Sequence, residues 1–159
     1  MNPLLALYLR EQRLAFSGGG GPAGPLAFNL AALTLAPLAI GPDMQALSAA
    51  GPGVIAFAFQ LATLQNAERL FGEDASDGTL ELYALSGLNL TLACGAKMLA
   101  FTVTTLWPGP LLAFAGGIAY GLDPGAALVL ALALALAAPG LALVAGFAGA
   151  LAAGLKRAG

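Results

Sequence analysis

The chain has 159 residues, of which 59% are hydrophobic and only 9% charged, and its mean hydropathy is +0.86. A water-soluble domain carries about 25% charged residues, so this composition excludes a fully water-exposed surface and makes the lipid bilayer the main solvent. A net charge of −2 gives no support to nucleic-acid binding. The single cysteine excludes a disulfide framework within the chain, and without histidine we expect no cofactor or metal site in this chain itself.

Residues 1–21 are predicted to form an interfacial helix followed by a glycine linker. The stretch from Leu4 to Phe16 is largely apolar and carries Arg10 and Arg13, which can reach lipid headgroups. The glycines from Gly18 to Gly21 would end this helix. The charges follow the apolar stretch instead of preceding it, which is not the pattern of a signal peptide. A frayed tail is the alternative interpretation.

Residues 22–159 are predicted to cross the membrane four times. A transmembrane helix needs about 20 predominantly apolar residues, and the charge-free stretches place the spans at about 22–40, 53–67, 90–115 and 126–153. Two motifs, Trp107-Pro-Gly-Pro110 and Pro139-Gly140, could divide the last two spans. The resulting pieces would be too short to cross, so we interpret both motifs as kinks.

The basic residues predict the orientation of the spans. With four crossings, all six arginines and lysines lie on the side of the two termini and of residues 68–86, whereas loops 41–53 and 120–125 carry acidic residues only. The positive-inside rule therefore makes both termini and the charged segment cytoplasmic. Lys97 lies near that end of the third span, either as a snorkelling anchor or as a partner for the acidic segment. We favour the anchor.

The segment ERLFGEDASDGTLE, residues 68–81, holds five of the eight acidic residues. Asp77-Gly78 is a turn signal, and Asp77 is suited to cap a short helix that continues through Tyr83. Glu81 would then lie in the first turn, where the helix dipole favours a negative charge. Such a helix could dock in a cleft of a cytoplasmic partner. A solvated hairpin loop is an equally good interpretation from these residues alone.

Several motifs together resemble a known family. The charged segment, with Glu68-Arg69, the run DGTLE at 77–81, Leu85-Ser86 and Lys97, resembles the cytoplasmic loop of ABC-2-type permeases. Four further motifs, covering nearly the whole chain, are similar to the haem exporter protein B (CcmB) family of cytochrome c maturation: LREQRLAF at 9–16, TLAPLAIGP at 34–42, AGPGV at 50–54 and GLKR at 154–157.

The resemblance implies a non-catalytic permease subunit of an ABC complex in the bacterial inner membrane, with residues 22–159 as the permease domain. It implies a separate CcmA-like ATPase that holds ATP and magnesium, CcmC-like and CcmD-like membrane subunits, a CcmE-like haem chaperone, and haem in the complex. The absence of a GxxxxGK[ST] motif agrees with an ATPase on another chain.

The resemblance also identifies a candidate coupling segment for the ATPase. Carried over to this sequence, it implies that Glu68 and Arg69 end the second span and pair locally, and that residues 77–81 face the ATPase. The complete set of candidate residues is Glu68, Arg69, Asp74, Asp77, Gly78, Thr79 and Glu81.

This sequence differs from the family pattern in two respects. Family members carry prolines after the loop, where this chain has Ser86-Gly-Leu-Asn-Leu90. The family has six spans and this sequence has four, so we expect either a C-terminally truncated member or an atypical one. Two other functions remain open, namely a general ABC-2 exporter half for lipid or drug and a four-helix membrane scaffold without an ATPase.

Overall fold

The structure is a computed structural model that describes residues 3–17, 22–85, 87 and 89–157. The predicted glycine linker at 18–21 and the position of Ser86 therefore lie outside the described residues. Within the helices, some side chains are also outside the described part, namely those of Pro3, Ser17, Glu68, Arg69, Glu73, Leu80, Ala84, Lys156 and Arg157.

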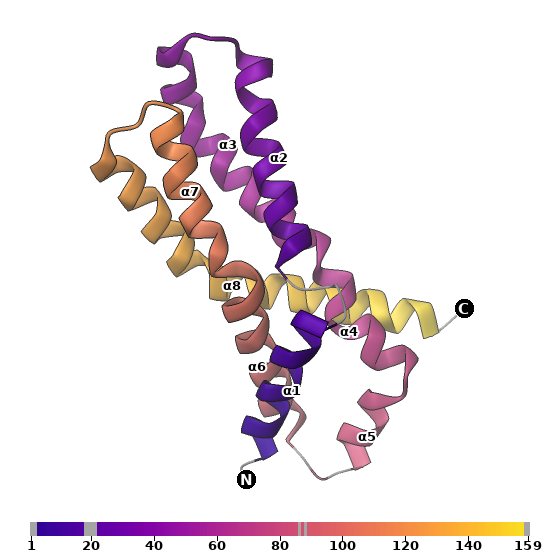
Figure 1. The fold of residues 1–159 in the computed structure, drawn as a ribbon. Coiled ribbons are helices and arrows are strands. Elements are labelled where there is room, and N and C mark those ends of the chain that lie inside the picture. Colours follow the sequence, from indigo (N-terminus) through magenta and orange to yellow (C-terminus); the bar gives the residue numbers. More distant parts are fainter. Residues whose placement is uncertain (1–2, 18–21, 86, 88, 158–159) are drawn as a thin grey trace.

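The regular structure of the described residues is helical throughout, which confirms an all-α membrane protein (Figure 1). In chain order the elements are α1 (Pro3–Ser17), α2 (Ala23–Ile40), α3 (Met44–Gln65), α4 (Ala67–Ser76), α5 (Thr79–Leu85), α6 (Leu90–Phe101), the π-helical turn η1 (Thr102–Leu106), α7 (Pro108–Ala119) and α8 (Pro124–Arg157).

Four helical segments are long and apolar enough to cross a membrane, as the sequence predicted. They are Ala23–Ile40, Met44–Ser76, Leu90–Ala119 and Pro124–Leu155. The first begins and ends within one residue of its predicted span at 22–40, and the last contains its predicted span at 126–153. These segments meet the requirement of length and low charge that the bilayer imposes and from which the spans were predicted.

The start of α3 differs from the prediction. We expected residues 41–53 to form a loop, which is wrong, because α3 begins at Met44 and includes Pro52. The carboxylate of Asp43 caps this helix by accepting a 2.9 Å hydrogen bond from the backbone N–H of Gln45. Gly51 allows close packing, since a Cβ there would lie 2.8 Å from Cδ2 of Tyr120. The Gly-Pro-Gly motif is thus part of a membrane helix, where proline is tolerated.

Residues 68–76 form a helix that the sequence analysis did not predict. A single residue, Asn66, separates α3 from α4. The buried residues Ala67, Leu70 and Phe71 pack α4 against the C-terminal half of α8. A Cβ at Gly149 of α8 would overlap the carbonyl group of Ala67, so the two backbones meet at close range.

Neither proline motif ends a helical segment, and a π-helical turn directly precedes the first one. At the first motif the backbone N–H of Trp107 donates a 2.9 Å hydrogen bond to the carbonyl oxygen of Thr102, which is the π-helical pattern. The span then continues to Ala119, beyond the predicted end at residue 115. Pro139 lies near the middle of α8, which bends in its middle part (Figure 1). The predicted kink in the last span agrees with this bend, and both motifs lie inside continuous helical segments, as predicted.

The connections lie at two ends of the bundle (Figure 1). The α2–α3 and α7–α8 turns, with Asp43 and Asp123, are at one end, and α1 and α5 are at the other. The start of α6, after the cap formed by Asn89, belongs to the second end as well. This separation agrees with the charge pattern of the sequence. The cytoplasmic position of the second end stays a prediction.

Candidate functional site

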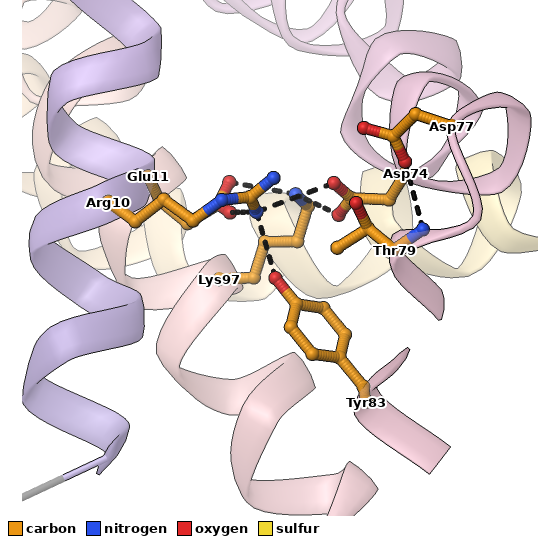
Figure 2. A network of polar contacts seen from close by, with 7 residues as sticks. All are labelled: Arg10, Glu11, Asp74, Asp77, Thr79, Tyr83 and Lys97. Carbon is orange, nitrogen blue, oxygen red and sulfur yellow. Dashed lines mark hydrogen bonds and ion pairs between the residues drawn. The ribbon is translucent and has the colours of Figure 1, made fainter. Parts of the chain in front are cut away.

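A cluster of four charged side chains joins three helices at the end of the bundle that carries α1 and α5 (Figure 2). Its centre is Lys97 of α6, whose side-chain Nζ lies 2.6 Å from Oδ2 of Asp74 and 2.7 Å from Oε2 of Glu11. Lys97 is 8% exposed and Asp74 only 3%. Buried charges are stable only when they are paired, and here one ammonium group is held between two carboxylates.

Arg10 completes the ion cluster, which we define as Arg10, Glu11, Asp74 and Lys97. Its Nη1 lies 3.0 Å from Oε1 of Glu11 and 3.5 Å from Oδ1 of Asp74. The same nitrogen donates a 2.8 Å hydrogen bond to the hydroxyl oxygen of Tyr83 in α5. Each of the four carboxylate oxygens therefore faces a cation, and the formal charges of the four groups sum to zero.

Regular helical spacing brings these charges to one place. On α4, the buried residues Ala67, Leu70 and Phe71 continue at the same spacing to Asp74. On α6, Ala93, Lys97 and Ala100 share one buried face, against which α1 packs. Asp74 and Lys97 are thus the polar members of two otherwise apolar stripes that meet beside Glu11 of α1.

The favoured interpretation of Lys97 as a snorkelling anchor is wrong. The lysine is buried and binds the acidic residue Asp74, together with Glu11 from the N-terminal helix. Its Nζ also lies 5.9 Å from the centroid of the Phe71 ring. Two features of the sequence could have indicated this pairing. Asp74 falls at the helical spacing of the apolar residues Ala67, Leu70 and Phe71, and Lys97 interrupts a long charge-free stretch.

The turn before α5 follows the predicted chemistry. The carboxylate of Asp77 accepts a 2.9 Å hydrogen bond from the backbone N–H of Thr79, where the helix begins (Figure 2). Gly78 has a positive φ of 79°, which a residue with a side chain rarely adopts. The hydrogen bonds that this carboxylate accepts from Thr79 lower the pKa of the exposed Asp77 carboxyl group. Asp77, Gly78 and Thr79 therefore define the start of α5.

The remaining predicted site residues lie on α4 and α5. Asp74 belongs to the ion cluster, so its carboxylate is engaged inside the chain. Glu68 and Arg69 are in the first turn of α4, and their predicted ion pair falls on side chains outside the described residues. Glu81 is half-buried in the first turn of α5. Whether any of these residues contacts an ATPase stays a prediction.

The outward face of α5 is apolar. Leu82 is 63% exposed and Leu85 is 83% exposed, three residues further along the helix. Tyr83, by contrast, points to Arg10, and burial raises the pKa of its hydroxyl group, with Asp74 contributing in the same direction. From the sequence we expected Tyr83 to share an apolar face with Leu80 and Ala84, and we expected no role for Leu82 or Leu85. In the structure the hydroxyl group of Tyr83 instead accepts from Arg10.

A pocket of about 100 Å³ lies beside the ion cluster. Its polar wall includes Glu11, Asp74 and Lys97, and the hydroxyl-bearing residues Thr104 and Thr105 come from the π-helical turn. Leu14 and Ala15 make α1 one of its walls. Among the described residues no group of three His, Cys, Asp or Glu side chains is placed to hold a metal ion. The absence of a cofactor from this chain stays a prediction.

The fold and the ion cluster define an α-helical multi-pass membrane protein with a short amphipathic helix outside its spans. The sequence profile of the CcmB protein family matches residues 2–159. The chain is 36% identical over 159 residues to heme exporter protein B of Bradyrhizobium diazoefficiens, covering all of this chain and 72% of that protein. It is 37% identical over 158 residues to heme exporter protein B of Pseudomonas aeruginosa, covering 99% of this chain and 71% of that protein.

A third relative, heme exporter protein B of Escherichia coli, is 40% identical over 102 residues, which are 64% of this chain and 46% of that protein. The extent of these matches shows the family directly, and the chain belongs to the CcmB family. The resemblance that rested on short motifs along nearly the whole chain is thereby confirmed.

Proposed function

We propose that this protein is the non-catalytic membrane permease subunit of an ABC-type haem exporter that serves cytochrome c maturation in the bacterial inner membrane. Membership of the CcmB family and the names of its relatives support the haem-export part. The observation that carries the ATPase part is α5, a helix outside the spans that turns two leucines outward while its tyrosine is bound to the ion cluster.

The exposure pattern of α5 favours a docking helix over a solvated loop. A solvated loop would be expected to expose its polar side chains and bury its apolar ones, whereas Leu82 and Leu85 are the most exposed described side chains of α5. Two apolar anchors three residues apart on a helix fit an apolar cleft of a partner protein. The acidic start of the helix, with Asp77 and Glu81, would favour basic residues at the rim of that cleft.

The proposed partners rest on membership of the CcmB family. Without a phosphate-binding GxxxxGK[ST] loop, energy from ATP must come from a separate CcmA-like ATPase that holds ATP and magnesium. CcmC-like and CcmD-like membrane subunits and a CcmE-like chaperone complete the proposed assembly, in which ATP hydrolysis drives haem handling or release of the haem-loaded chaperone.

Affinity purification in a mild detergent tests this proposal. We expect the tagged wild-type chain to bring down an ATPase together with CcmC-like and CcmD-like chains, and the assembly to absorb in the haem Soret region. A lone ATPase without haem absorption would instead indicate a general ABC-2 exporter, and no ATPase would indicate a scaffold. Either result contradicts the proposal.

A pair of variants tests the role of α5 in the same experiment. The double variant Leu82→Ser/Leu85→Ser should lose the ATPase, because both exposed anchors are removed. The matched control is Leu155→Ser, which changes a leucine of similar exposure at the end of α8. Retention of the ATPase by the double variant would show that α5 is not the docking helix.

A further inference from the structure

We propose that the ion cluster is a latch that positions α5 relative to α6, so that a movement of α5 reaches the pocket beside the π-helical turn. Lys97 is the central positioning residue of this latch. The proposal rests on the proposed function, because it treats α5 as the helix on which an ATPase acts. It concerns what happens inside this chain after docking.

The first step connects α5 to the cluster. Arg10 donates to the hydroxyl oxygen of Tyr83 at 2.8 Å and lies 3.0 Å from Glu11 on its own helix. Arg10 is separated from Tyr83 by 73 positions in the sequence, so this contact links two distant segments. We therefore expect a displacement of α5 to displace α1 as well, because Arg10 connects the two helices.

The second step connects the cluster to α6. Asp74 lies one short turn before α5 in the chain and binds Lys97 at 2.6 Å, and Glu11 of α1 binds the same ammonium group at 2.7 Å. Separating a buried lysine from both carboxylates would leave uncompensated charges in a medium of low dielectric constant. The cluster is thus expected to move as one unit or to open completely, which is the behaviour of a latch.

The third step leads from α6 to the pocket. Lys97 lies five residues before Thr102, the first residue of the π-helical turn, and both Lys97 and Thr104 line the pocket. In this turn the regular backbone pattern is interrupted, and the hydroxyl group of Thr104 donates to the carbonyl oxygen of Ala100 at 2.7 Å. A π-helical turn is a common place for a helix to change direction. Movement of α6 at this turn would change the shape of the pocket.

The wall formed by α1 strengthens this inference. Glu11, Leu14 and Ala15 line the pocket from the same helix that carries Arg10. Opening of the ion cluster would release α1 and α6 together, which are two walls of one pocket. An arrangement that only stabilised the fold would not need to link the pocket to Tyr83 of α5.

The test distinguishes an effect on the position of α5 from an effect on stability. One variant removes the charge of Lys97 alone, and a second removes the opposite charges of Lys97 and Asp74 together. Lys97→Met leaves Asp74 buried without its closest cation, and we expect the thermal midpoint to fall by about 10 °C. In Lys97→Met/Asp74→Asn the remaining Arg10 and Glu11 can pair with each other, so most of this loss should be recovered. Lys97→Arg keeps the charge and serves as the conservative control.

The decisive measurement is the position of α5 in the chain alone, in lipid vesicles and without an ATPase. Spin labels at Leu85→Cys on α5 and Leu111→Cys on α7, in a Cys94→Ser background, report the distance across the π-helical turn. We expect a narrow distance distribution in the wild-type background and about a twofold broader one in Lys97→Met/Asp74→Asn. If the stable double variant had the same distance distribution as the wild-type background, the proposal would be wrong, whether or not an ATPase binds.

A second measurement uses the assembly with its ATPase. The double variant keeps Leu82 and Leu85, so it should still bind the ATPase, but the effect of the permease on the rate of ATP hydrolysis should fall at least about fivefold. Lys97→Arg should retain a larger share of this effect. If the double variant regained both stability and full coupling, the cluster would be structural only and the proposal would be wrong. Failure of the wild-type chain to bind an ATPase would instead contradict the proposed function.

Discussion

The hydroxyl group of Tyr120 donates a 2.6 Å hydrogen bond to the carbonyl oxygen of Leu33. In a regular helix that carbonyl would accept from the residue four positions later, which is Pro37 and has no N–H. The tyrosine, at the end of α7, thus supplies a donor that α2 lacks. The side chain is almost fully buried, so this bond also fixes the turn before α8 against α2.

We predict that Tyr120→Phe lowers the free energy of unfolding by about 1–2 kcal/mol, because a buried carbonyl group loses its donor. Thermal or denaturant unfolding in detergent measures the loss. In a Pro37→Ala background the backbone N–H of residue 37 can bond to Leu33, so the same change should cost less. An equal cost in both backgrounds would show that the bond does not compensate for the proline.

Gly109 is expected to be intolerant of a side chain. A Cβ at this position would overlap the ring of Phe59, which is itself buried in the core. We predict that Gly109→Ala destabilises the fold by about 1–3 kcal/mol through overpacking, measured as a shift in the unfolding midpoint. Gly53→Ala is the matched control, because a Cβ there meets no atom within 4 Å and alanine favours a helix. A midpoint for Gly109→Ala equal to that of the control would contradict this account.

Gly149 allows α8 to approach the backbone of α4. A Cβ at this position would overlap the carbonyl oxygen of Ala67, which cannot rotate away as a side chain can. Gly149→Ala should therefore separate α4 from α8 and lower stability by about 2 kcal/mol or more. It should also increase hydrogen exchange of the α4 amides. Gly140→Ala, where a Cβ meets no atom within 4 Å, should leave both measurements nearly unchanged.

Charge and length predict helices in a membrane protein more reliably than glycine and proline predict loops. Charge-free length predicted the four helical segments that are long and apolar enough to cross, because the bilayer excludes charge and requires about 20 apolar residues per crossing. The Gly-Pro-Gly motif at 51–53 was misread as part of a loop. In a water-soluble protein that motif usually ends a helix. Here α3 continues through it, and Tyr120 packs against Gly51.

The ion cluster could not be predicted in full from the sequence. Asp74 and Lys97 each break a local pattern, and that signal was available. The contact between Lys97 and Glu11 joins positions 86 residues apart, and only the packing of α1 on α6 brings them together. The family resemblance drew attention to the charged segment, whose role in coupling stays a prediction. It did not reveal that Asp74 points inward or that Leu82 and Leu85 point outward, because burial is a property of the packed helices.

The final prediction concerns the cap of α5 and its dependence on pH. Hydrogen bonds from Thr79 lower the pKa of the Asp77 carboxyl group below its ordinary value of about 3.9. The stabilising effect of this carboxylate is therefore fully present above the ordinary value, and it is lost as the pH falls through the lower value of the folded chain. We expect the α5 amides to be protected from hydrogen exchange at pH 7 and to lose part of that protection at about pH 3, after correction for intrinsic exchange rates.

Two variants isolate this carboxylate from the other acidic groups that titrate in the same range. Asp77→Asn keeps an oxygen that can accept from the backbone N–H of Thr79 but does not titrate. Its α5 protection should change less between pH 7 and pH 3 than that of the wild type, whereas Asp77→Ala should show reduced protection at both values. If Asp77→Asn lost protection on acidification as fully as the wild type does, groups other than Asp77 would control the order of α5.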